Sequence, residues 1–307
     1  MIGSDKVIKG QSDIVTAKHG RPLCPSVPLS LGVIMRGRMW GLALYLFVLG
    51  FILNLLGIVG HVMVSAFAYR WFGTPLPRAF TTEWFSFAWK EFGLARVLGV
   101  TILVALAVVV LALLLGFPAA YVLARRNFRA KPFLMLLYFL PLLIPQMTYG
   151  IPLATTMFRY GIGGTVTGVI LAVMVPMVPL AIFILMPFFE QISLNLEWGA
   201  AVMGANRFQV FRRILLPLTL PGLLTAGILI LVNTVSNFEL TFLVSGAGSQ
   251  TLVVALFYNV FAGGVRPVYS VDAMAMMYMT MVLSLLLVAL RFVRPTQMVF
   301  RLDQPRR

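Results

Sequence analysis

VLGVTILVALAVVVLALLLGFPAAYVLA, residues 97–124, contains no charged residue. The hydrocarbon core of a bilayer is about 30 Å thick, and an α-helix crosses it in about 20 residues. This run is therefore long enough to span a membrane as one helix. Other apolar runs of similar length follow or precede it, so the sequence predicts an all-α, polytopic membrane protein with six transmembrane helices. The expected spans are residues 39–69, 97–124, 132–157, 163–189, 218–245 and 271–290.

The composition agrees with a membrane protein and gives its expected orientation. Hydrophobic residues make up 60% of the chain and charged residues 11%, whereas soluble domains have about 25% charged residues. The net charge is +15. Most of the Lys and Arg residues fall on one side if both termini are cytoplasmic, as the positive-inside rule expects. We therefore predict a cytoplasmic tail at 1–38, a transmembrane region at 39–292 and a second cytoplasmic tail at 293–307. Orientation, and not nucleic-acid binding, then explains the charge.

Several kinds of catalytic site lack the residues that they need. Cys24 is the single cysteine, and His19 and His61 are the two histidines, which leaves little material for a metal site or for a nucleophile with a neighbouring base. No lysine is followed by Ser or Thr, so the chain has no P-loop to hold ATP and magnesium. We expect a chain that is not an enzyme and that binds no metal or cofactor.

The longest predicted inner loop, residues 190–217, has an organised sequence. Its first part, 195–203, is compatible with a helix; Gly204 interrupts it, and Asn206 can cap a second short helix. Two short helices would form a protrusion that another protein could contact. A connector whose arginines face anionic lipid is equally compatible with the residues. The next span is expected to begin near two prolines, Pro217 and Pro221.

The same loop resembles the EAA loop of ABC-importer permeases, whose pattern is Glu-Ala-Ala, three residues, Gly, and a basic and aromatic segment that ends in Leu-Pro. Here the pattern reads Trp198-Gly199-Ala200, Gly204-Ala205 and FQVFRRILLP at 208–217. Trp198 occupies the glutamate position, and Glu197 precedes it. Because one residue rotates a helical side chain by about 100°, Glu197 is not an equivalent replacement. The resemblance covers about 95–292, including LGFPAAYVLARRNFRAKP at 115–132.

The resemblance implies a type I ABC-importer permease in the inner membrane of a bacterium. Such a permease pairs with a second permease subunit, identical or different, and with two ABC ATPase subunits that bind ATP and magnesium. An extracytoplasmic solute-binding protein delivers the solute. The residues expected to contact the ATPase are Glu197, Trp198, Gly199, Ala200, Gly204, Ala205 and Arg207.

The fifth predicted span contains a polar run, VNTVSNFELTF, that indicates the solute path. Its candidate path residues are Asn233, Ser236, Asn237 and Glu239. An ionisable side chain within a span is costly to insert, so Glu239 should face water or the protein interior. Alternatively, Glu239 is a structural carboxylate that contacts another subunit. The run resembles the acidic segment of polyamine-type permeases, which favours a polyamine-like cation as solute. Permeases for ferric iron or aminophosphonate, and a stand-alone secondary transporter, are the alternatives.

Overall fold

The computed structural model describes residues 31–69, 71, 74–261 and 267–292, and within them the secondary structure is helical apart from one isolated bridge between Ala68 and Phe80. The predicted all-α fold class is therefore confirmed. The tail residues 1–30 and 293–307 lie outside the described residues, although the first helix begins at Leu31, within the stretch assigned to the N-terminal tail. The helices are α1 (Leu31–Phe67), α2 (Glu83–Glu91), α3 (Leu94–Arg125), α4 (Lys131–Leu143), α5 (Gln146–Arg159), α6 (Val166–Gln191), α7 (Leu194–Val202), α8 (Arg207–Val210), the π-helix η1 (Phe211–Leu215), α9 (Leu216–Val235), α10 (Glu239–Val244), α11 (Leu252–Phe261) and α12 (Val268–Phe292).

Helices long and apolar enough to cross a membrane agree with most of the predicted spans. Among the described residues there are 5 of them, or up to 6 if the bent pair α4–α5 counts as one span. The five candidate spans are Trp40–Phe67, Leu94–Arg125, Val166–Gln191, Arg207–Val235 and Val268–Arg291.

The part of α1 up to Gly57 forms a unit separate from residues 58–292, so each is described by itself.

The predicted span 132–157 is not one straight helix. It consists of α4 and α5, which meet at an angle of 94°. Pro145 causes the break because the residue before a proline is pushed out of the helical region. Ile144 has a ψ of 135°, which is an extended conformation. The third span is thus a bent pair whose corner lies at residues 144–145.

The predicted span 218–245 also differs, at both ends. A continuous helical stretch begins at Arg207, so Pro217 and Pro221 do not mark its beginning. Pro217 has no N–H to donate to the Arg213 carbonyl, and the helix accommodates it through the wide turns of η1. The stretch ends at Val235, and Glu239 is the first residue of α10. Glu239 therefore lies after a helix break and not within a continuous span.

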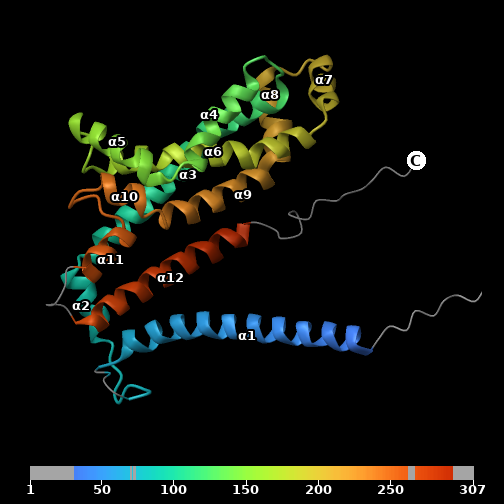
Figure 1. The fold of residues 1–307 in the computed structure, drawn as a ribbon. Coiled ribbons are helices and arrows are strands. Elements are labelled where there is room, and N and C mark those ends of the chain that lie inside the picture. Colours follow the sequence, from blue (N-terminus) through green and yellow to red (C-terminus); the bar gives the residue numbers. More distant parts are fainter. Residues whose placement is uncertain (1–30, 70, 72–73, 262–266, 293–307) are drawn as a thin grey trace, which may run out of the picture. The chain divides into compact units, whose positions relative to one another are not determined.

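The core of the membrane region is built from α3, α6 and α9, which pack against one another (Figure 1). Small residues allow this close approach, as is common between membrane helices. A Cβ at Gly116 of α3 would lie 2.6 Å from the Cβ of Ala181 on α6. A Cβ at Gly222 of α9 would lie 2.6 Å from the ring of Phe188. These contacts fix the three helices that carry the polar and loop segments described below.

Two short helices, α2 and α11, were not expected from the sequence. Helix α2 packs against α12, and Trp84 of α2 donates a hydrogen bond from Nε1 to the Ala68 carbonyl at 2.8 Å. The hydroxyl of Ser65, near the end of α1, donates to Asp272 of α12. Both elements are short, and α2 is amphipathic, so neither has the long apolar run that reveals a membrane span.

We predict that Gly116→Ala destabilises the protein, because its added methyl group would overlap Ala181. Overpacking of this kind costs about 1–3 kcal/mol. Thermal unfolding in detergent should show a lower Tm. Gly99→Ala on the same helix is the matched control, because nothing lies within 4 Å of its added Cβ. Adding Ala181→Gly should restore the Tm of Gly116→Ala, and equal losses in both glycine variants would contradict the packing argument.

Candidate functional site

Two helix breaks face each other in the structure. One is the α4–α5 corner, and the other is the stretch between the end of α9 and the start of α10. Helices α5 and α10 pack together, because Gly150 of α5 has no side chain to collide with Leu240 and Leu243 of α10. Beyond α5, the backbone N–H of Gly164 donates to the Val244 carbonyl at 2.9 Å. The packing of α5 on α10 thus brings both breaks to one place.

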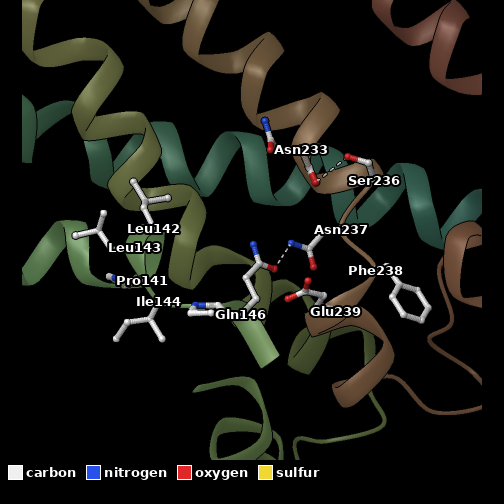
Figure 2. A pocket seen from close by; sticks show the side chains of 11 residues that line it. Pro141, Leu142, Leu143, Ile144, Gln146, Asn233, Ser236, Asn237, Phe238 and Glu239 are labelled. Atoms are coloured by element: carbon white, nitrogen blue, oxygen red, sulfur yellow. Dashed lines mark hydrogen bonds between the residues drawn. The ribbon is translucent and has the colours of Figure 1, made fainter. Parts of the chain in front are cut away.

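A pocket of about 520 Å³ lies between the two breaks (Figure 2). The structure brings all four predicted path residues to it, although they lie on α9, on α10 and in the break between them. A fifth polar residue, Gln146, comes from the first turn of α5 and was not predicted. Gln146 is a polar residue directly after Pro145 inside an apolar run, and this position could have indicated its role from the sequence. The polar lining residues are Gln146, Asn233, Ser236, Asn237 and Glu239.

Asn237 joins the two breaks. Its side chain is buried, with 7% of its surface exposed. The Nδ2 group donates to Oε1 of Gln146 at 2.8 Å, and the Oδ1 atom accepts from the backbone N–H of Leu240 at 3.3 Å (Figure 2). Thr241 also donates its hydroxyl to the Asn237 carbonyl. The bonds to Leu240 and Thr241 satisfy backbone groups beside the helix break, and the bond to Gln146 joins the two breaks. Asn237 thereby holds the shape of the pocket.

Glu239 is the one acidic residue of the lining, and its carboxylate lies beside the Gln146–Asn237 pair (Figure 2). The side chain is half-buried and makes no hydrogen bond or ion pair within the part of the chain that the structure describes. Asn233 and Ser236 donate to carbonyls of their own helix, each at 2.8 Å. The acceptor atoms of Glu239 and Asn233 remain directed to the pocket. The pocket therefore offers hydrogen-bond acceptors and one negative charge.

The loop that resembles the EAA loop forms a second structured region. We call residues 192–215 the connecting segment. Asn206 caps α8 in a reciprocal capping box, in which its Oδ1 accepts from Gln209 N at 2.8 Å and Gln209 Oε1 accepts from Asn206 N at 2.9 Å. Gly204 has φ +86°, a conformation that favours glycine. The predicted helix, glycine interruption and Asn206 cap are all confirmed, but the second helix continues into α9.

Glu197 faces the interior of the chain. Its Oε1 atom lies 2.8 Å from Arg125 at the end of α3, and Oε2 accepts a hydrogen bond from the Tyr121 hydroxyl at 2.8 Å. The two charged side chains are only 9% and 12% exposed. This ion pair joins α7 to α3, and the contact of Glu197 with an ATPase stays a prediction. The residue thus fixes the connecting segment to the membrane helices.

Trp198 faces outward, one position after Glu197. Its side chain is 64% exposed, and Val202 and Met203 are each 89% exposed. On the opposite side, Ala200 and Ala205 pack against a small core of Ile192, Val210 and Leu215. Gly199 faces open space, and Arg207 is exposed at the first turn of α8. The predicted loop residues therefore divide into an inward set and an outward apolar surface.

No cluster of three or more His, Cys, Asp or Glu residues suited to a metal ion occurs in the described ranges. The polar pocket contains one carboxylate and amide and hydroxyl groups, a set that can bind by hydrogen bonding and by charge. It has no nucleophile paired with a base. The arrangement suits reversible binding of a polar solute.

Residues 112–295 match the family described as binding-protein-dependent transport system inner membrane component. The chain belongs to this family. It is therefore a multi-pass protein of the inner membrane. The matched range contains both the polar pocket and the connecting segment.

The relatives are named for different solutes. The chain is 36% identical over 129 residues to the trehalose transport permease SugB of Mycobacterium tuberculosis. The aligned stretch makes up 42% of this chain and 47% of SugB, so the chain spans about half the length of that relative. It is 31% identical over 170 residues to the molybdate/tungstate permease WtpB of Pyrococcus abyssi, covering 55% and 68%. The fold is similar to that in a crystal structure of a bacterial ABC transporter that imports alginate, with a TM-score of 0.71, 18% identity, and 84% and 97% coverage. Resemblance to the permease family is confirmed, while the polyamine subtype stays a prediction.

We predict that Glu197→Gln loosens α7, because the Arg125 guanidinium loses its anionic partner. Hydrogen bonds to charged groups contribute about 1.5–3 kcal/mol. Hydrogen exchange of the amides in 194–202 should accelerate by about tenfold or more. Arg125→Gln should have a similar effect, and the double variant should show less than the sum because both changes remove one interaction.

Glu190→Gln is the matched control, since Glu190 is exposed near the end of α6 and has no partner among the described residues. It should leave α7 exchange unchanged. Unchanged exchange in Glu197→Gln would show that the ion pair does not hold the segment.

Proposed function

We propose that this chain is a permease subunit of an ATP-driven importer and that the pocket between the two helix breaks lies on the path of the solute. Membership of the family supports the transport role. The main observation in support of the solute path is the pocket itself, where polar side chains gather between two broken membrane helices. Non-helical backbone at membrane depth is tolerated where it is enclosed by protein or lines a water-filled cavity. A solute path provides such a cavity.

The lining favours a solute rich in hydrogen-bond donors, and a polyamine-like cation fits best. The Glu239 carboxylate would attract an ammonium group, and the free amide oxygen of Asn233 would accept a further bond. The same carboxylate would repel an oxyanion such as molybdate and the phosphonate end of an aminophosphonate. Ferric iron would find only one carboxylate ligand. A sugar is the second candidate, because amides both donate to and accept from hydroxyls and one relative is named as a trehalose permease.

The power source would be a separate ATPase that contacts the connecting segment. The sequence has no P-loop, and Trp198, Val202 and Met203 form an exposed apolar surface that a protein partner could cover. We infer two ATPase subunits that bind ATP and magnesium, a second permease subunit and an extracytoplasmic solute-binding protein. The connecting segment and both termini would lie in the cytoplasm. A stand-alone secondary transporter would need no such surface.

Replacement of Glu239 distinguishes the two solute classes. Glu239→Gln keeps the size and a hydrogen-bonding oxygen but removes the charge. Because charged hydrogen bonds contribute about 1.5–3 kcal/mol, spermidine uptake should fall by about tenfold or more. Trehalose uptake would change much less with Gln than with Ala. Uptake of both labelled solutes is measured in cells that express the whole transporter.

Glu190→Gln serves as the control for expression and assembly, because it also removes one negative charge but lies away from the pocket. Normal uptake of every tested solute by Glu239→Gln and by Glu239→Ala would show that this residue does not lie on the solute path.

The ATPase contact is tested by Trp198→Ala. Large aromatic side chains at interface centres contribute about 2 kcal/mol or more, so the ATPase should dissociate about thirtyfold more readily during purification of the complex. Trp89→Ala is the matched control, because Trp89 is 49% exposed on α2, outside the connecting segment. Solute uptake that continues without any ATPase would support the secondary transporter instead.

A further inference from the structure

A second cavity, of about 730 Å³, lies beside the connecting segment and has no role in the solute path proposed above. It is bordered by α3, by α7 and by the continuous stretch from α8 through η1 into α9. Its volume is within the range of about 300–1,000 Å³ that proteins use for small ligands. We call this cavity the α3–α9 groove.

The groove extends along α3 from Leu113 to Arg126, the residue that follows the helix. At 1.5 Å per residue this stretch rises about 20 Å. One leaflet of a bilayer is about 15 Å thick in its hydrocarbon part and about 20 Å thick with its headgroup region. Because Arg126 lies at the end of the membrane helix, the groove reaches from the membrane face toward the middle of the bilayer. Its length is that of one leaflet.

Charge is confined to one end of the groove. Arg126 and Arg207 are both exposed there, and neither makes a hydrogen bond or ion pair within the described residues. Glu197 also lines this end, but its carboxylate is already held by Arg125 and Tyr121. Two guanidinium groups from distant parts of the sequence are thus left for an anion. Arginines suit phosphate because their planar fork can donate two parallel hydrogen bonds.

The rest of the groove is apolar. Its walls include Leu113 and Phe117 on α3, and Leu216 and Leu223 on α9. A small free anion would use the arginines and leave these walls exposed. An amphipathic ligand with a phosphate at one end and a hydrocarbon chain at the other would cover both. The combination of length, charge and apolar lining therefore selects among possible ligands.

We propose that the α3–α9 groove binds an anionic phospholipid. The phosphate lies between Arg126 and Arg207, and one acyl chain lies along Leu113 and Phe117. Because these arginines belong to α3's end and to α8, the headgroup connects the membrane helix to the connecting segment. It acts at the same junction as the Glu197–Arg125 ion pair. Lipid composition would then affect how firmly the connecting segment is held.

The test uses the purified transporter with its co-purifying subunits, reconstituted in phosphatidylcholine vesicles that contain spin-labelled phosphatidylglycerol or spin-labelled phosphatidylcholine. Electron paramagnetic resonance measures the immobilised fraction of each label. The wild-type protein should hold phosphatidylglycerol in preference to phosphatidylcholine. Because each basic residue near the surface contributes appreciably to binding of anionic lipid, Arg126→Gln with Arg207→Gln should reduce that preference by about tenfold or more.

The matched control is Arg129→Gln with Arg212→Gln, which removes two exposed arginines that do not line the groove. It should keep most of the preference, and an equal loss would show general surface attraction and overturn the site. Leu216→Trp tests the chain-binding part, because it fills the groove without changing charge and should also release the lipid. Displacement of the label by inorganic phosphate would identify a simple anion site. Equal immobilisation of both labels in the wild-type protein would refute the proposal, and tryptophan fluorescence melting confirms that each variant is folded.

Discussion

The need to pair backbone polar groups inside a membrane is the constraint on which this structure depends. An intact helix pairs its own groups, but the breaks at Ile144–Pro145 and after Val235 leave some of them without helical partners. The protein brings the two breaks together and uses Asn237 to bond across them. Asn237 also pairs backbone groups at its own break, and the meeting of the two breaks creates a polar cavity among apolar helices.

Close helix packing makes this arrangement possible. Gly116 and Gly222 allow α3 and α9 to lie against α6, and Gly150 allows α5 to lie against α10. A larger residue at these positions would separate the helices and move the pocket-lining residues apart. The pocket thus depends on small residues that do not themselves line it.

The connecting segment shows how neighbouring residues can take opposite roles. Glu197 turns inward to Arg125 and Tyr121, while Trp198 is exposed. On a helix, adjacent side chains point about 100° apart, so one contact fixes the segment and the other remains available to a partner. The carboxylate of Glu197 is used within the chain. The outward surface is correspondingly apolar.

The sequence by itself determined the helical class, the approximate spans and the glycine-separated connecting segment, because these depend on local properties: apolar run length, proline and glycine conformation, and Asn206 capping. It also selected Glu239 and the three polar residues near it, although not Gln146. Only the tertiary structure decided that residues 132–157 bend by 94°, that Gln146 meets Asn237 and that Glu197 pairs with Arg125. These contacts join segments far apart in the chain, and their formation depends on how the helices pack, which no local pattern specifies.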